Sequence, residues 1–246
     1  HLSLELGGKS PILIFNDADL EGAVNGAVAG NFGASGQSCV AGSRVFVQAG
    51  IHDEFLEMLI RRAEAIRIGD PLHEDTQMGP LATEAQRDRI EAVVAESRDQ
   101  GATVHTGGKR PEGFDTGWYF EPTVLGCDSQ SIRSTQVELF GPVMSVLTFE
   151  SEEEAVAMAN DSVFGLGAGV FTTDVGRAHR VAKAVHSGIV WVNTYRAISP
   201  VAPFGGFGQS GHGREAGIDT IYDYTRTKTV WINTSEDPMA NPFVMR

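Results

Sequence analysis

Cysteine is scarce in this sequence: Cys39 and Cys127 are the only two in 246 residues. Two thiols are too few for a disulfide framework and suit the reducing cytoplasm, where we expect this protein to be located. A chain of this length buries a sizeable core without disulfide or metal cross-links. The sequence therefore excludes a small disulfide-rich secreted domain.

Long apolar runs and an excess of basic charge are also lacking. No stretch approaches 18 consecutive apolar residues, which excludes a transmembrane helix, and no secretory signal pattern opens the chain. With 19 Lys and Arg against 32 Asp and Glu, the formal net charge is −13. Nucleic acids and anionic membrane surfaces both require a basic footprint, so neither is an expected partner.

Metal and phosphate-binding motifs are lacking as well. The seven histidines form no H-E-x-x-H motif and no cluster with cysteine, so we expect no metal site. Residues 206–211 match G-x-G-x-x-G, but the nearest predicted strand ends near residue 193 and the βαβ context is wrong. We therefore reject these residues as a dinucleotide-binding fingerprint. No Walker-type phosphate loop occurs either.

Apolar segments of strand length alternate with segments of helical periodicity along most of the chain. The expected strands are residues 10–15, 43–48, 103–106, 119–125, 143–149, 167–172, 189–193 and 228–232. One expected helix starts near residues 17–19, and four others cover residues 53–67, 83–98, 151–159 and 174–185. This alternation predicts an α/β fold with a mostly parallel sheet. Residues 201–217 contain no clear element, and long irregular loops are commonly functional.

Three residues could carry chemistry on local grounds. Cys39 lies in a glycine-flanked turn where backbone amides can lower the pKa of the thiol and make it nucleophilic, although a buried structural cysteine is the alternative. Glu5 is a general base if burial raises its pKa, and otherwise a solvent-facing acid at a strand end. Glu138 precedes a Gly-Pro turn and leaves the same two alternatives open. Cys127 has no such surroundings and is expected to be structural.

Six segments, in order, resemble signatures of the aldehyde dehydrogenase superfamily. Residues 4–10 (LELGGKS) resemble its glutamate signature, and residues 36–39 (GQSC) resemble its cysteine signature at the usual separation. The other four are residues 138–142 (ELFGP), 160–166 (NDSVFGL), 191–193 (WVN) and 203–206 (PFGG). Each segment alone is weak, but together they cover about residues 1 to 233. The sequence therefore resembles the catalytic, C-terminal half of an NAD(P)-dependent aldehyde dehydrogenase.

The resemblance implies a role for each matched residue. Cys39 would attack the aldehyde carbon to give a thiohemiacetal and, after hydride transfer, a thioester. Glu5 would then activate the water that hydrolyses the thioester. The implied cofactor-binding residues are Glu138, Phe140 and Gly7, and the implied substrate-contacting residues are Phe204 and Val40. Asn193 would be a structural residue near the site.

The resemblance also implies a domain organisation. Residues 1–209 would form the catalytic domain, a three-layer α/β/α unit with a mostly parallel sheet. Residues 210–246 would form a C-terminal segment whose strand, Thr227–Ile232, pairs with another subunit of a homodimer or tetramer. In the family, the nucleotide-binding domain and an asparagine that stabilises the oxyanion precede the glutamate signature, whereas this chain begins at His1. We therefore expect a fragment of a longer protein that is inactive alone.

Two other functions are compatible with the sequence. A cofactor-free esterase or thioesterase would use Cys39 and Glu5 without a nucleotide. A non-catalytic assembly module would need only the sheet edge and the tail strand. Labelling with iodoacetamide separates the second alternative from the catalytic ones, because a scaffold does not require a reactive Cys39.

The first testable prediction concerns the cofactor. We expect the isolated chain to bind NAD(P)+ too weakly for use, because the family's nucleotide fold lies before the glutamate signature. Isothermal titration calorimetry with NAD+ measures this directly. Binding with a micromolar Kd would contradict the prediction.

Overall fold

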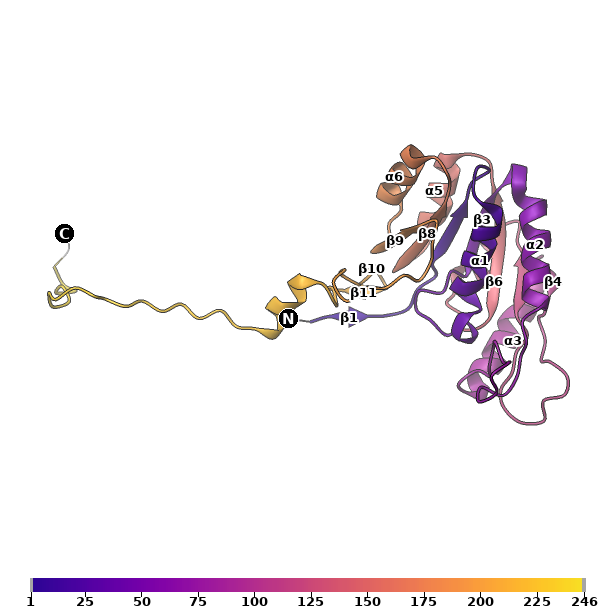
Figure 1. Ribbon diagram of the computed structural model, residues 1–246, viewed down its shortest axis with the longest axis horizontal. Coiled ribbons are helices and arrows are strands. Elements are labelled where there is room, and N and C mark those ends of the chain that lie inside the picture. The colour runs from indigo at the N-terminus through magenta and orange to yellow at the C-terminus, as the bar shows by residue number, and fades with distance from the viewer. Residues whose placement is uncertain (1, 245–246) are drawn as a thin grey trace.

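Short apolar runs form the strands of one central sheet in the computed structural model, which describes residues 2–244. Within those residues, seven strands lie in the order β4-β5-β6-β3-β2-β8-β9 (Figure 1). All neighbouring pairs are parallel except β4 and β5, which confirms the prediction of a mostly parallel sheet. The strands are β2 (Pro11–Ile14), β3 (Arg44–Gln48), β4 (Thr103–Thr106), β5 (Thr123–Gly126), β6 (Val143–Phe149), β8 (Gly167–Phe171) and β9 (Ile189–Val192).

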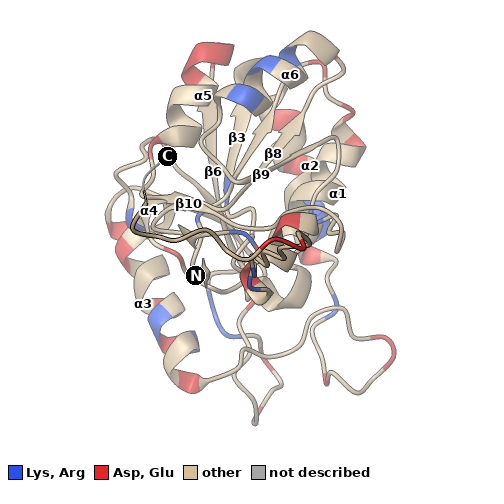
Figure 2. Ribbon diagram, turned by 90° about the vertical axis from the view of Figure 1, so that its left-hand side faces the viewer, with Lys and Arg blue, Asp and Glu red and all other residues tan. Residues whose placement is uncertain are grey.

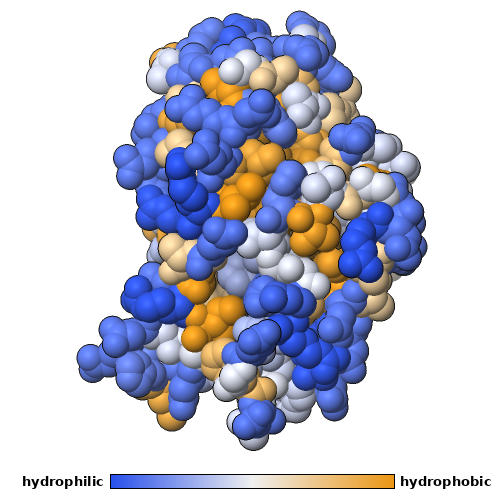
Figure 3. Space-filling model, turned by 90° about the vertical axis from the view of Figure 1, so that its right-hand side faces the viewer, coloured by the Kyte–Doolittle hydropathy of each residue, from blue (hydrophilic) through white to orange (hydrophobic). Residues whose placement is uncertain are grey.

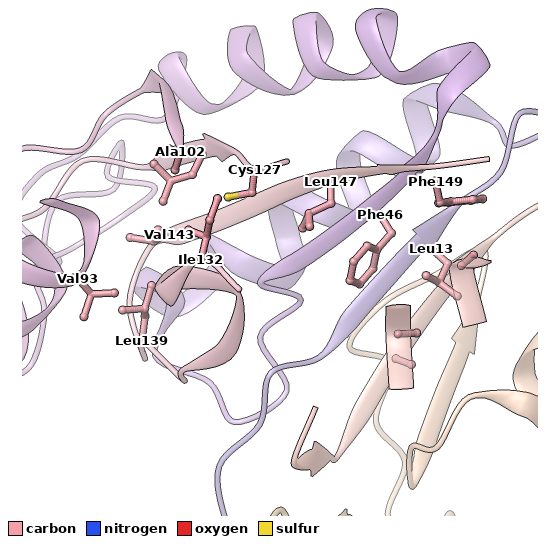
Figure 4. Close-up of a cluster of buried hydrophobic side chains, with 14 of the residues drawn as sticks. Leu13, Phe46, Val93, Ala102, Cys127, Ile132, Leu139, Val143, Leu147 and Phe149 are labelled. Carbon is pink, nitrogen blue, oxygen red and sulfur yellow. The ribbon is translucent and has the colours of Figure 1, made fainter. Parts of the chain in front are cut away.

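Helices cover both faces of this sheet, so the predicted three-layer α/β/α arrangement is confirmed. Alternate residues of one strand point to opposite faces: Ile12 and Ile14 pack with α1 (Leu20–Asn31) and α2 (His52–Glu64). Leu13 packs on the other face, in a cluster that Figure 4 shows in part. The helices on that face are α3 (Glu84–Asp99), the short α4 (Arg133–Gln136), α5 (Glu152–Asn160) and α6 (Val175–Ala184).

Capping side chains mark the starts of three helices close to the predicted positions. Thr83, Ser151 and Asp174 each accept a hydrogen bond from a backbone N–H in the first turn of α3, α5 and α6 respectively. Two predicted boundaries were wrong. Helix α2 ends at Glu64 instead of residue 67, and β5 begins at Thr123 instead of residue 119, directly after Pro122, which has no N–H to donate to a sheet.

The prediction that residues 201–217 lack regular structure was wrong in part. They contain two short strands, β10 (Phe207–Gly208) and β11 (Gly211–His212). Strand β10 pairs with β7 (Phe164–Gly165), and β11 pairs with β1 (Leu4–Glu5). Two-residue strands are too short to show an alternating pattern in the sequence. The pairing of β1 with β11 brings residues 4–5 beside the glycine-rich loop of residues 201–217.

The tail strand expected at Thr227–Ile232 is not formed in this single chain. After the 3₁₀ helix Ile218–Tyr224, residues 225–235 lie in no helix or strand and extend away from the body (Figure 1). Trp231 is 93% exposed. A strand needs an adjacent strand to satisfy its N–H and C=O groups, and no neighbouring edge lies beside this segment here. Residues 245–246 of the predicted C-terminal segment lie outside the described residues.

Charged side chains of both signs are spread over the outer helices. Helix α3 carries charges of both signs, whereas α5 carries only acidic and α6 only basic side chains (Figure 2). On the face that carries α2 and β4, apolar and hydrophilic side chains form small separate patches (Figure 3). Between residues 2 and 244, no helix is long and apolar enough to span a membrane. The same residues contain no group of three or more His, Cys, Asp or Glu side chains arranged to hold a metal ion.

The carboxylate of Asp17 links the ends of two adjacent strands, β2 and β8. Asp17 follows β2 and accepts hydrogen bonds from the backbone N–H groups of Thr173 and Asp174, at 3.0 and 2.9 Å, and from the Thr172 hydroxyl. The guanidinium of Arg177 lies 2.7 Å from the same carboxylate. Although partial burial opposes the charged form, these donors hold the pKa of Asp17 at about 2.

We expect Asp17→Asn to destabilise the fold by about 1–3 kcal/mol, because several donors lose a charged acceptor. A group whose pKa is lowered by folding stabilises above its unfolded pKa, so this contribution disappears as the pH falls from about 4 to 2. Urea unfolding at pH 7 and at pH 2 measures both effects. The exposed Asp19, which makes no side-chain cap bond, supplies the control Asp19→Asn. Equal stability of the two variants at pH 7 would contradict the prediction.

Candidate active site

The loop that carries Cys39 is held in an unusual backbone conformation. Ala34, Ser35 and Gly36 have φ values of 55°, 56° and 70°, all in the left-handed region. Such a run is costly for non-glycine residues and persists only where neighbours hold it. The Ser35 hydroxyl donates to the carbonyl of Gly79 at 2.9 Å, and the Gln37 side chain accepts from the N–H of Ala82 at 2.9 Å. The segment 79–82 therefore fixes the approach to Cys39.

Gly8 brings the N-terminal motif into direct contact with the Cys39 backbone. Gly8 is buried, and a Cβ atom at this position would overlap the carbonyl oxygen of Cys39. Only glycine permits two backbones to approach this closely without a shift of one of them. The two sequence motifs, which lie far apart along the chain, therefore meet at one point.

Glu138 reaches the same point from the loop before β6. Its Oε1 accepts the N–H of Gly8 at 3.1 Å, and its carboxylate occupies the space that a Cβ at Gly7 would need. The guanidinium of Arg89 on α3 donates to the Glu138 carbonyl at 2.8 Å. Phe140 has a φ of 52°, and its side chain remains partly exposed beside this carboxylate loop. Predicted cofactor residues Glu138, Gly7 and Phe140 thus lie together.

The Glu5 carboxylate is shielded from solvent but has no hydrogen-bond partner among the described residues. Neither of its oxygens has accessible surface. Burial raises the pKa of Glu5, the negative charge of Glu215 raises it further, and Arg214 opposes them. Strand β1 holds Glu5 opposite Gly211 of β11. This is the environment that a general base needs, because an unsolvated carboxylate accepts a proton more readily.

The thiol of Cys39 is half-buried and lies within electrostatic range of both carboxylates. Burial raises its pKa, and the charges of Glu5 and Glu138 raise it further, while the backbone amides of Val40 and Cys39 lower it. The expectation that nearby amides give an acidic thiol was therefore wrong in its net direction. Desolvation and two negative charges outweigh the amides. The thiol must lose its proton as it reacts.

The two predicted substrate-contacting residues lie at the same apolar cluster but differ in burial. The Val40 side chain is buried in the cluster beside α1 and α2, and Phe204 packs partly against that cluster. Phe204 and Glu215 exchange two backbone hydrogen bonds of 2.6 Å. Phe204 is thereby linked to Glu215, the residue whose charge acts on Glu5.

Cys127 is buried on the opposite face of the sheet, 3.9 Å from the Ser134 hydroxyl.

Several residues of this site were not predicted from the sequence. Glu215 and Arg214 lie in the loop that was expected to be irregular, and the side-chain amide of Gln86 donates to the carbonyls of Leu139 and Phe140. Gln86 follows the predicted helix cap Thr83, so its position at the first turn of α3 was the available signal.

The loop around Glu138 has the chemistry to hold a nicotinamide nucleotide. A carboxylate oriented by the N–H of Gly8 can accept hydrogen bonds from sugar hydroxyls. Gly7 leaves room for that carboxylate, and the 39% exposed Phe140 offers an aromatic surface to a planar ring.

The chain is similar to known proteins in both sequence and structure. Residues 1–230 match the Aldehyde dehydrogenase family. The chain is 51% identical over its full length to a (Z)-2-((N-methylformamido)methylene)-5-hydroxybutyrolactone dehydrogenase of Acinetobacter baylyi, covering 50% of that protein. It is 49% identical over 94% of its length to a betaine aldehyde dehydrogenase of Brucella melitensis, covering 48% of it. The chain thus spans about half the length of the curated relatives it matches.

Solved structures agree with these sequence matches. An aldehyde dehydrogenase from Bacillus cereus in complex with NAD+ superimposes with a TM-score of 0.91 and 41% identity. A betaine aldehyde dehydrogenase from Staphylococcus aureus with NAD+ gives 0.88 and 43%. Each match covers 96% of this chain and 48% of the solved chain.

We expect Gly8→Ala to slow alkylation of Cys39 by iodoacetamide, by about tenfold or more, because the new methyl group displaces the Cys39 carbonyl and moves the Cys39 and Val40 amides relative to the sulfur. Mass spectrometry of the native protein measures the rate at each cysteine. Gly176→Ala in α6 is the matched control, since its Cβ would meet only side-chain atoms of Asp174 and Arg180, at 3.1 and 3.2 Å. A Gly8→Ala protein that is folded and labels at the control's rate would rule out this role for Gly8.

Proposed function

The chain belongs to the aldehyde dehydrogenase family, and from this premise we propose that it provides the nucleophile and the general base for oxidation of an aldehyde to a carboxylic acid with NAD(P)+. The observation that carries the proposal is the shielded carboxylate of Glu5, which has no hydrogen-bond partner between residues 2 and 244 and whose charge acts on the Cys39 thiol. Relatives of similar identity are named for different substrates, so the proposal is confined to aldehydes as a class.

In the first step, the Cys39 sulfur bonds to the aldehyde carbon and the thiol proton leaves. Because burial raises the thiol pKa, the proton needs an acceptor close by. Glu5 is suited to this task, since its oxygens have no hydrogen-bond partner among the described residues and its own pKa is raised. The carbonyl oxygen becomes an oxyanion, for which the backbone N–H of Cys39 is one donor.

The second step converts the thiohemiacetal to a thioester on Cys39. NAD(P)+, when bound, would supply the acceptor for the hydride on the former aldehyde carbon. Glu138, Gly7 and Phe140 are the residues of this chain that would hold the nicotinamide end of that cofactor, through the carboxylate and the exposed aromatic ring described above. Phe204 would contact the aldehyde side chain, and Val40 would support the nucleophile from the core.

In the third step, Glu5 removes a proton from water, and the resulting nucleophile attacks the thioester carbon. The carbon–sulfur bond breaks, the carboxylic acid leaves, and Cys39 regains a proton. A base is effective here only when ionised. Since burial raises the pKa of Glu5, the hydrolysis rate should fall with decreasing pH through a value above 4.5, the ordinary pKa of this group.

Two substitutions in the natural full-length protein test this function. Cys39→Ser should reduce aldehyde oxidation by about 10³-fold or more, because a hydroxyl is a far weaker nucleophile. Glu5→Gln should lower the steady-state rate by about 10²–10⁴-fold and should also slow the burst of NADH, since both the deprotonation of the thiol and the hydrolytic step lose their base. Stopped-flow absorbance at 340 nm separates the burst from the steady state.

The matched control is Cys127→Ser, at the thiol on the opposite face of the sheet, which should keep a burst and a steady-state rate near those of the parent protein. Dehydrogenase activity that survives Cys39→Ser would refute the proposal. Nucleotide-independent ester hydrolysis that depends on Cys39, without any aldehyde oxidation, would favour the esterase alternative.

A further inference from the structure

The residue directly after β9 lies in the left-handed region of backbone conformation. Asn193 has a φ of 53°, a conformation that asparagine tolerates better than most residues. Its side-chain oxygen accepts the N–H of Thr172 at 3.0 Å, and its amide donates to the Thr172 carbonyl at 2.9 Å. This clamp on the end of β8 fixes the turn and directs the next aromatic residue, Tyr195, back into the core.

The ring of Tyr195 occupies a slot lined by glycines. It is buried, and its centroid lies 4.8 Å from that of Trp191. A Cβ at Gly30 of α1 or at Gly169 of β8 would come within 2.9 or 2.8 Å of this ring, closer than packed carbon atoms approach. The slot therefore depends on small residues from two separate elements, and it leaves the ring a single position.

The hydroxyl of Tyr195 reaches the loop that carries Cys39. It donates a hydrogen bond of 2.9 Å to the carbonyl oxygen of Val40, the residue that follows Cys39. Burial raises the pKa of Tyr195, so this group remains a protonated donor at physiological pH. The carbonyl of the preceding residue, Cys39 itself, is in contact with Gly8. Two consecutive peptide groups are thus each held from outside the loop.

We propose that Tyr195 is a positioning residue for the Cys39 nucleophile: its hydrogen bond to Val40 holds the 39–40 backbone so that the amides of Cys39 and Val40 face the sulfur. Those amides are the groups that favour the thiolate against burial and the neighbouring carboxylates. This inference rests on the proposed function, in which Cys39 is the nucleophile. Tyr195 itself does not touch the reacting atoms.

The test removes only the hydroxyl, with Tyr195→Phe in the natural full-length protein. Tyr119→Phe is the matched control, because Tyr119 is also buried and donates to a backbone carbonyl, that of Gly69, at 3.2 Å in a different part of the fold. The pH dependence of iodoacetamide labelling at Cys39, read by mass spectrometry, gives the thiol pKa. Labelling of the buried Cys127 reports any loss of folding in the same samples.

For Tyr195→Phe, we expect the Cys39 thiol pKa to rise and labelling at pH 7.5 to slow by about three- to tenfold, the range expected when one hydrogen bond is lost. The kcat for aldehyde oxidation should fall by a similar factor while KM stays within about twofold. Tyr119→Phe should change neither the Cys39 thiol pKa nor the kcat. Both variants should lower the unfolding midpoint.

Two outcomes would overturn separate claims. If Tyr195→Phe is folded, with Cys127 protected, and has the same thiol pKa and kcat as Tyr119→Phe, the positioning role is wrong while the proposed function stands. If complete alkylation of Cys39 in the parent protein leaves aldehyde oxidation intact, the proposed function is wrong, and the positioning role falls with it.

Discussion

The contact between the Gly8 backbone and the Cys39 carbonyl is the constraint on which the rest of the site depends. A side chain at residue 8 would separate the motif that contains Gly8 from the motif that contains Cys39. It would also displace Glu138, whose carboxylate accepts the Gly8 N–H. The same short segment contains Glu5, which strand β1 presents toward the site. One close backbone approach thus positions the proposed nucleophile, the proposed base and the carboxylate proposed to bind the cofactor relative to one another.

The electrostatics of the site follow from that geometry. Two carboxylates and partial burial make the thiol harder to ionise, whereas backbone amides favour its anion. The carboxylate of Glu5 is also harder to ionise, because it is buried near Glu215. Such opposing influences are typical of reactive sites, where a group must accept a proton in one step and release it in another. The aldehyde dehydrogenase family to which the chain belongs gives these groups a chemical context.

Much of the fold was predictable because it rests on local patterns. The apolar runs around Ile12 and Val45 and the caps at Thr83 and Ser151 specify buried strands and helix starts within a few residues. The strands β10 and β11 were not predictable, since two-residue pairings depend on partners distant in the sequence. The tail strand was expected from its composition, but composition does not supply the neighbouring edge that a strand requires.

The candidate site, like the fold, was predictable only in part. Cys39, Glu5 and Glu138 lie in recognisable motifs, and the structure brings all three together. Tyr195 and Glu215 were missed because their roles arise from contacts with Val40 and Glu5 that no sequence spacing reveals. The direction of the Cys39 pKa shift was also missed, since the neighbouring amides are visible in the sequence while burial is not.

The central claim is that Glu5 and Cys39 share one reaction centre, and the thiol pKa of Cys39 in a Glu5→Gln protein tests it most directly. Iodoacetamide labelling of Cys39 as a function of pH measures that value in both proteins. Because the Glu5 charge raises the thiol pKa, its removal should lower the pKa and speed labelling at neutral pH. An unchanged titration curve in a folded Glu5→Gln protein would contradict the account.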